Sequence, residues 1–213
     1  MIRVMRRLLF CILAFPAAAE NGGVIPVPYA PLLRELSEII DFEEFPSRLS
    51  PGMKQDAPLL FEGAALGERF AGQVAVQDGG YDRLTGQPGA PLALLPGPPG
   101  QNLTITHIFI LSNQVQGLSA PGFPDRESGG EGAVAILFEQ DQRRLGFRVS
   151  AEARPDRPQP RGRMQVTFHG RDGTIIDRLD LELEWGRNGY GFARPDDQRD
   201  IAGITIELSL IHI

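Results

Sequence analysis

The sequence is poor in the residues and motifs that carry the best-known site chemistries. Among its 213 residues it has one cysteine, one tryptophan and three histidines, and the histidines are far apart in the chain. A zinc site needs several nitrogen or sulfur ligands close together, so no zinc motif is present. Gly-x-Ser-x-Gly, His-Glu-x-x-His and phosphate-cradling glycine loops are also absent from the sequence. We therefore expect a protein that is not an enzyme.

The first residues have the three parts of a secretory signal peptide. Residues 1–7 contain three arginines, residues 8–15 are apolar, and residues 17–19 are alanines. This order predicts cleavage before Glu20. The apolar run is too short to span a membrane, and an uncleaved anchor is the alternative interpretation. We expect a periplasmic or extracellular protein.

Removal of residues 1–19 would leave one domain-sized chain without cysteine, because Cys11 lies in the removed segment. That segment carries three arginines and no acid, so 18 basic and 27 acidic residues would remain, a net charge of −9. Nucleic-acid binding needs cationic patches, and an acidic chain argues against it. The remaining sequence has no second long apolar run, so we expect no transmembrane segment after cleavage.

The clearest structural pattern is an alternation of apolar and polar residues on both sides of the turn-forming residues 170–173. Apolar residues occupy every second position of 164–168 and again of 179–185. A period of two predicts an antiparallel hairpin with one buried face. On this register Phe168 points into the core and Thr167 to the surface. Trp185 continues the apolar series and is predicted in the core.

Shorter runs predict further strands, and the segments between them are rich in glycine, proline and polar residues. The predicted strands lie at 38–42, 59–61, 69–76, 103–111, 134–138, 145–151, 188–192 and 204–210. The long predicted loops lie at 45–58, 78–100, 113–132 and 154–163. The short connection at 139–142 predicts that its two flanking strands pair as a second hairpin.

These patterns predict an all-β fold, an antiparallel β-sandwich of about ten short strands without a convincing helix. Long loops mixed with tight hairpins favour a jelly roll over an up-and-down barrel. In this division of the chain, residues 1–19 are the signal peptide, residues 20–36 an extended leader, and residues 37–213 the sandwich domain.

From about Asp41 onward, the order of motifs resembles a loose group of secreted bacterial jelly-roll domains that are similar to carbohydrate-binding modules. The matching pieces are IDFEEF at 40–45, GAVAILF at 132–138, LGF at 145–147, VTFHGRDGTI at 166–175, GF at 191–192 and IAGITI at 201–206. The chain departs from that group because residues 207–213 lack its closing acidic-aromatic strand and sorting tail. The resemblance implies a sandwich fold and carbohydrate binding.

The same resemblance implies a calcium ion that ties the first strand to the last. Its candidate ligands are Asp41, Glu43 and Glu44, which Asp196, Asp197 and Asp200 would join if the chain ends lie side by side. Calcium requires six to eight oxygen ligands. The alternative is a solvated acidic edge that discourages strand-to-strand aggregation. No other cofactor is expected.

Aromatic side chains are the candidates for sugar binding, because a flat ring stacks on the apolar face of a pyranose. Tyr190 lies between glycines, and Tyr81 lies beside Asp82 in a predicted loop, so both are expected to be exposed. Tyr81, Asp82 and Tyr190 are the predicted ligand-binding residues. By contrast, His107 shares an apolar face and is predicted to be a hydrogen-bonded core histidine.

The expected function is that of a secreted or periplasmic non-catalytic binding module for a carbohydrate or cell-envelope glycan. A structural or assembly protein of the envelope, with a protein partner, is the first alternative. A glycan-acting hydrolase or lyase is the second. Carboxylate pairs are easy to find among 27 acidic residues, so they do not decide for an enzyme.

Overall fold

The computed structural model describes residues 23–79, 81–108, 112–151 and 162–209. In these residues the chain is an all-β antiparallel sandwich, and the predicted fold class is confirmed. The jelly-roll topology stays a prediction. The predicted signal peptide, and all but the last two residues of the predicted loop at 154–163, lie outside the described residues.

A six-stranded antiparallel sheet forms the centre of the molecule. Its strands in spatial order are β15 (Ile175–Leu183), β14 (Gly162–His169), β17 (Ile201–Ser209), β12 (Val134–Gln142), β4 (Ala64–Gly67) and β3 (Leu59–Phe61). The β14–β15 hairpin was predicted from the sequence and is confirmed, with Val166 opposite Leu179. The last long strand, β17, pairs with β14 on one side and β12 on the other.

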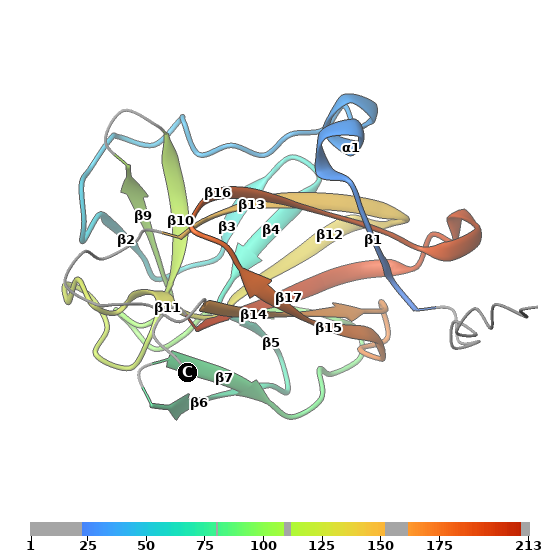
Figure 1. Cartoon of the computed structure of the whole chain (residues 1–213). Coiled ribbons are helices and arrows are strands. Elements are labelled where there is room, and N and C mark those ends of the chain that lie inside the picture. Colours follow the sequence, from blue (N-terminus) through green and yellow to red (C-terminus); the bar gives the residue numbers. More distant parts are fainter. Residues whose placement is uncertain (1–22, 80, 109–111, 152–161, 210–213) are drawn as a thin grey trace, which may run out of the picture.

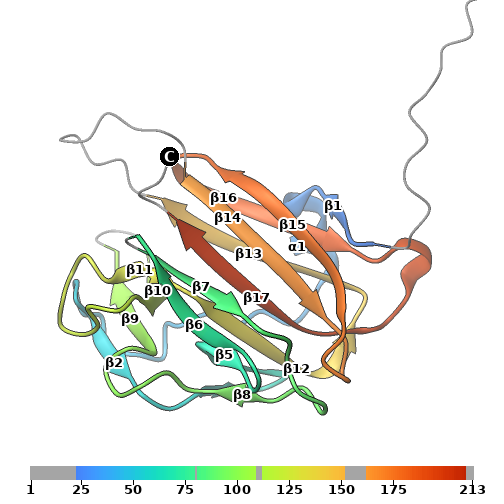
Figure 2. The same ribbon diagram turned by 90° about the horizontal axis from the view of Figure 1, so that it is seen from below.

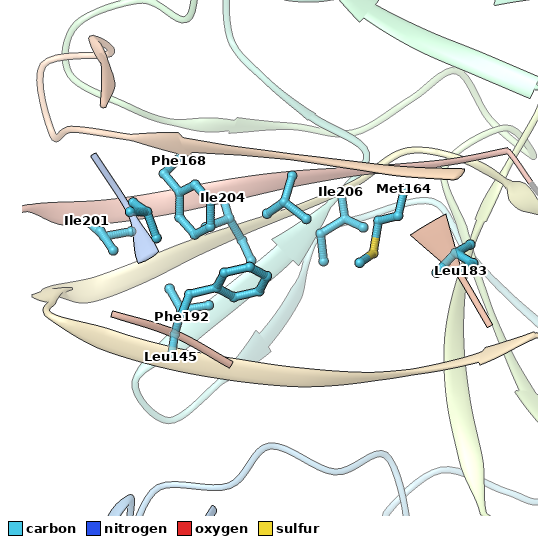
Figure 3. Close-up of a cluster of buried hydrophobic side chains, with 10 residues drawn as sticks. Leu145, Met164, Phe168, Leu183, Phe192, Ile201, Ile204 and Ile206 are labelled. Atoms are coloured by element: carbon cyan, nitrogen blue, oxygen red, sulfur yellow. The ribbon is translucent and has the colours of Figure 1, made fainter. Parts of the chain in front are cut away.

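The main hydrophobic core lies between one face of this sheet and a three-stranded sheet. The smaller sheet contains β1 (Ile25–Val27), β16 (Gly186–Ala193) and β13 (Arg144–Ala151). Figure 3 shows Phe168 and Ile204 of the central sheet facing Leu145 and Phe192 of the smaller one. The Phe168 and Phe192 rings meet edge to face, with their centroids 5.2 Å apart. Burial of such large apolar side chains is the dominant favourable contribution to folding.

The opposite face of the central sheet is covered in part by two small hairpin-like sheets. One pairs β5 (Arg69–Phe70) with β8 (Leu94–Leu95), and the other pairs β6 (Val74–Asp78) with β7 (Tyr81–Thr85). Figure 1 shows these layers, with the β6–β7 hairpin on the side of the central sheet opposite to β13 and β16. In Figure 2 the hairpin lies along β17, and residues of β7 contact residues of β17.

A four-stranded sheet packs at one end and encloses a second apolar cluster. It contains β11 (Gly129–Gly132), β10 (Asn113–Leu118), β9 (Leu103–His107) and β2 (Met53–Gln55). Leu103 and Ile105 of β9 are fully buried against Leu59 and Leu66. The strand predicted at 103–111 is present as β9, over residues 103–107, and lies between β2 and β10.

The segment predicted as an extended leader instead contributes β1 and a helix, α1 (Tyr29–Glu35). Pro31 lies in the first turn of this helix, where the missing amide hydrogen has no intrahelical partner to lose. The helix docks directly on the backbone of β16. A Cβ atom at Gly189 would lie 2.2 Å from Cδ1 of Tyr29, so only glycine leaves room for this ring. A 3₁₀ turn, η1 (Pro195–Asp197), precedes β17.

The predicted second hairpin is wrong, because β12 and β13 belong to different sheets. β12 pairs with β17 and β4, whereas β13 pairs with β16. Ile136 of β12 and Phe147 of β13 nevertheless pack on the same core. The alternation correctly indicated which face of each strand is apolar. It does not indicate whether two such strands pair side by side or face each other across the core.

Four other sequence predictions also fail locally. The loop predicted at 45–58 contains β2. Residues 38–42 form no strand, and Phe42 instead packs edge to face on Phe61, with ring centroids 5.7 Å apart. The predicted loop at 113–132 contains β10 and β11, and the predicted loop at 78–100 contains β7 and β8. The glycines that suggested a loop allow close approach in β10 and β11, where Gly117 pairs with Gly132.

Trp185 does not lie in the core, which corrects its predicted register. β15 ends at Leu183, which is buried, and Trp185 falls in the connection to β16 with 36% of its surface exposed. The buried alternation therefore ends at Leu183, two residues before the tryptophan. Among the residues that the structure describes, no helix is long and apolar enough to cross a membrane.

Candidate functional site

The structure separates the two tyrosines that were predicted to bind a ligand. Tyr81 begins β7 in the hairpin outside the central sheet, and its hydroxyl donates a hydrogen bond to Oδ2 of Asp78 at 3.2 Å. Tyr190 lies on β16 and packs against the main core, where its ring centroid is 6.0 Å from that of Phe147. Burial raises the pKa of Tyr190, and the charge of Glu184 adds to this. The two tyrosines do not share an exposed face.

Asp82 follows Tyr81 but points the other way, because side chains alternate along a strand. Its carboxyl is buried, and this burial raises its pKa, while a hydrogen bond with the backbone of Ala120 acts in the opposite direction. Asp82 therefore contacts the loop after β10. It is not placed to bind the same ligand as Tyr81.

The acidic residues predicted to hold calcium are exposed at the turn before Phe45. The Glu43 carboxylate accepts a hydrogen bond from the backbone amide of Asn113 at 3.0 Å. The Asp41 carboxylate accepts one from the backbone amide of Glu43 at 3.2 Å. The carboxylates expected to complete the site are engaged elsewhere: Asp197 pairs with Arg143 and Arg144, and Asp200 pairs with Arg194. In the described parts of the chain, no three His, Cys, Asp or Glu side chains form a group suited to a metal ion. These residues do not fit the calcium site that the resemblance implies.

His107 is hydrogen-bonded, as predicted, but it does not lie in the core. The residue is half-buried, and its Nδ1 lies 3.0 Å from Oδ1 of Asn113. The side-chain Nδ2 of Asn113 also donates hydrogen bonds to the carbonyl oxygens of Phe42 and Phe45. His107 therefore belongs to a structural network at the end of β9 and β10.

A different part of the molecule concentrates polar side chains on rigid strands. The outer face of β14 carries Gln165, Thr167 and His169, and the pairing register places polar partners on both sides of them. Thr167 pairs with Thr205 of β17 and Arg178 of β15. Gln165 pairs with Glu207 of β17 and Asp180 of β15. This face is polar where the opposite face is apolar.

Side-chain hydrogen bonds connect these registers across the strands. Nε of Arg178 donates to Oγ1 of Thr167 at 3.2 Å, and Nε2 of Gln165 donates to Oδ1 of Asp180 at 2.8 Å. Arg178 and Asp180 are exposed, whereas Thr167 is 2% exposed. The buried part of the face thus orients the exposed groups at its edge.

The β6–β7 hairpin meets this polar face at Glu207. This residue is 8% exposed, and its Oε2 accepts a hydrogen bond from the Leu84 amide at 2.9 Å. Burial raises the pKa of Glu207, and the nearby charges of Arg178 and Arg83 partly offset this effect. Burial and the neighbouring Asp78 raise the pKa of Tyr81, and the charge of Glu207 contributes in the same direction.

We call this meeting of hairpin and sheet the polar seam. Its members are Tyr81 and Arg83 of β7, Gln165 of β14, Arg178 and Asp180 of β15, and Glu207 of β17. The seam offers two guanidinium groups and an amide as donors, the Asp180 carboxylate as an acceptor, and one aromatic ring. The Glu207 carboxyl is buried and joins the hairpin to the sheet. Sequence analysis found only Tyr81 of these six. Gln165, Asp180 and Glu207 lie on predicted strands, whereas Arg83 lies in the loop predicted at 78–100. The pairing register brings them together, and the sequence pattern does not show that register.

His169 continues the polar face beneath β5 and is fully buried. Its ring meets that of Phe70 edge to face at 5.2 Å, and Nε2 lies 3.3 Å from Oγ1 of Thr205. Nδ1 has no hydrogen-bond partner among the residues that the structure describes. Burial, with a smaller contribution from the charge of Arg178, lowers the pKa of His169 to about 4.

We expect His169 to make the fold sensitive to acid. Between about pH 6.5 and 4 the unfolded chain binds a proton on this histidine and the folded chain does not, so stability falls as the pH falls. The loss is at most about 3 kcal/mol, and it is complete below pH 4. Urea melts of wild type and His169→Gln at several pH values measure it. The difference in unfolding free energy between the two proteins should change in this window.

Asp82 and Glu207 have raised pKa values and act in the opposite sense, because acidification relieves the cost of burying their charge. Comparison with His169→Gln cancels their contribution, since both proteins contain them. A pH-independent difference between the two proteins would contradict the assignment of a buried neutral histidine.

The fold is an antiparallel β-sandwich whose central sheet carries the main core on one face. The other face carries a smaller apolar cluster on β12 and β17 and the polar side chains of β14, β15 and β17. No protein-family model matches this chain, and neither a curated protein nor a solved structure matches it. The function is therefore argued from the seam itself.

Proposed function

We propose that this protein is an exported, non-catalytic binding module whose ligand is a carbohydrate, bound at the polar seam. The observation that carries the proposal is the meeting of the half-buried Tyr81 and Gln165 with three exposed charged side chains. These are Arg83 of β7 and Arg178 and Asp180 of β15. Sugar hydroxyls both donate and accept hydrogen bonds, so a ligand of this class uses the guanidinium and carboxylate groups together. The Tyr81 ring offers an apolar surface for the sugar face.

The charge balance of the seam favours a neutral glycan over a polyanion. Arg83 pairs with Asp78 at 3.3 Å, and Arg178 lies near both Asp180 and Glu207. Each cation thus has an acidic neighbour, and a polyanion would meet carboxylates together with the arginines. Recognition of polyanions draws on unbalanced positive charge.

Binding is favoured over hydrolysis by the environment of Glu207. A glycosidase presents two carboxyl groups to the bond that is cleaved. Asp180 is exposed, but Glu207 is 8% exposed and its Oε2 is already engaged by the Leu84 amide. In this arrangement Glu207 links the β6–β7 hairpin to β17 and is not presented to a substrate.

Replacing Tyr81 with alanine is expected to weaken glycan binding. Loss of an aromatic stacking partner costs about 0.5–1.5 kcal/mol, so the dissociation constant should rise by up to roughly tenfold. Affinity gels containing neutral or acidic polysaccharides, run with the mature protein, measure this as lost retardation. Trp185→Ala is the matched control, since Trp185 is also exposed but lies away from the seam, in the β15–β16 connection. Absence of retardation on every polysaccharide, or an equal loss in both variants, would refute the proposal.

An assembly protein of the envelope is the second candidate, and one observation favours it. Leu60 lies on β3, the outer strand of the central sheet, and is 80% exposed. An exposed apolar edge strand is a template for pairing with another chain. Recovery of a stoichiometric protein partner that is lost in Leu60→Glu, together with no glycan retention, would favour assembly over carbohydrate binding.

A further inference from the structure

The β6–β7 hairpin is connected to the central sheet in an unusual way. Its two strands form a sheet of their own, so no ladder of backbone hydrogen bonds joins it to β17 in the described structure. The Leu84 amide instead donates to the Glu207 carboxyl at 2.9 Å, a contact between residues 123 positions apart. The Glu207 side chain therefore joins the hairpin to the central sheet, whereas backbone hydrogen bonds join the strands within each sheet.

The pairing register shows what this contact positions. Tyr81 pairs with Asp78 and Arg83 with Val76, so these two side chains share one face of the hairpin. Asp82 and Leu84 share the other face, and Asp82 is buried there. Holding Leu84 against Glu207 therefore fixes how Tyr81 and Arg83 are presented beside the sheet.

Glu207 is surrounded by charged and titratable groups from each element that forms the seam. Arg178 and Asp180 approach from β15, and Arg83 and Tyr81 approach from β7. Burying a carboxyl costs more than burying an apolar side chain of similar size. The Glu207 carboxyl accepts a hydrogen bond from a backbone amide of another sheet, and an apolar side chain cannot make this bond.

We propose that Glu207 is the positioning residue of the polar seam. By accepting the Leu84 hydrogen bond, it holds the β6–β7 hairpin so that Tyr81 and Arg83 lie beside Arg178 and Asp180. The effect on ligand affinity rests on the proposed carbohydrate binding, whereas the clamp on the hairpin does not. Glutamine at this position keeps the acceptor oxygen and preserves the clamp, and alanine removes it.

Amide hydrogen exchange measured by NMR tests the clamp without any ligand. In Glu207→Ala, exchange of the Leu84 amide should accelerate at least about tenfold, because this amide loses its acceptor, while amides of β14 remain protected. Glu207→Gln should retain protection at Leu84. Unchanged exchange in Glu207→Ala would overturn the proposal, and so would equal acceleration in both variants.

Glycan retention then tests the link to function. Glu207→Ala should lose retention on the affinity gel, and Glu207→Gln should keep it, a rescue that links binding to the clamp itself. If wild-type protein binds no polysaccharide while Leu84 behaves as expected, the proposed function fails and the clamp stands. Retention by Glu207→Ala equal to that of wild type would overturn the positioning role.

A second variant covers the case in which Glu207→Ala does not fold. Leu84→Pro removes the donor and leaves Glu207 in place. Proline is tolerated on an edge strand where the amide does not serve the ladder, and the Leu84 amide points to Glu207. This variant should lose glycan retention while the exchange pattern of β14 and β17 is kept. Full retention by a folded Leu84→Pro protein would contradict the proposal.

Discussion

Replacing Phe168 with alanine is expected to lower the free energy of unfolding by about 3–5 kcal/mol, a large share of the stability of a domain. Phe168 is fully buried between the two main sheets and packs against Phe192 at 5.2 Å between ring centroids. The loss combines the transfer of the ring to water with the cavity that rigid neighbouring strands leave unfilled. Equilibrium urea denaturation of the protein, followed by circular dichroism, measures it.

Leu60→Ala provides the matched control for an apolar side chain on the same sheet. Leu60 is 80% exposed on β3, so its removal should change stability by no more than about 0.5 kcal/mol. Similar losses at Phe168 and Leu60 would show that the main core does not lie between the central and the three-stranded sheets.

Replacing Arg194 with alanine is expected to cost about 3 kcal/mol, the second-largest effect. The buried guanidinium donates to both carboxylate oxygens of Asp200, at 2.8 and 2.9 Å, and to the carbonyl of Gly23 at 2.8 Å. It thereby joins the end of β16 to the start of β17 and to the segment before β1. Removal leaves a partly buried carboxylate without its partner.

Arg144→Ala is the matched control for an exposed arginine. Arg144 pairs with Glu35 at 2.8 Å and with Asp197 at 3.3 Å, but all three side chains are at least 40% exposed. Exposed pairs contribute about 0–1 kcal/mol, because water and salt screen the charges. Urea melts at matched ionic strength should therefore separate the two variants. A larger loss for Arg144→Ala than for Arg194→Ala would contradict the assignment of Arg194 as the structural arginine.

The sequence predicted the fold class because alternation of period two reports which strand faces are apolar. The β14–β15 hairpin follows directly, since a short Gly/Asp turn forces its strands to be neighbours. The partners of β12 and β13 do not follow, because strands in opposite sheets satisfy the same alternation. Here the apolar faces of β12 and β13 meet across the core.

The alternation of apolar and polar residues also did not predict that the second face of β14 is buried. Thr167 was expected at the surface, and the structure buries both Thr167 and His169. Polar residues at alternate positions usually indicate solvent, but here they pair with other polar residues under the small hairpins. Thr167→Ala is therefore expected to cost more stability than a substitution at an exposed position.

The candidate site was only partly accessible from the sequence. Tyr81 stands out as a rare aromatic residue next to glycines and an acid. Arg178 and Glu207 are ordinary members of alternating strands, and 28 residues separate them in the chain. They meet because β14 pairs with both β15 and β17, a register that depends on the whole sheet.

The most direct test of the polar seam as a ligand site is an NMR titration of ¹⁵N-labelled mature protein with soluble neutral oligosaccharides. Binding at the seam predicts that chemical-shift changes concentrate on amides of β7, β14 and β15, and that amides around Tyr190 and Trp185 stay unchanged. Shifts centred on the β15–β16 connection, or no shifts with any oligosaccharide, would contradict the seam as the site of carbohydrate binding.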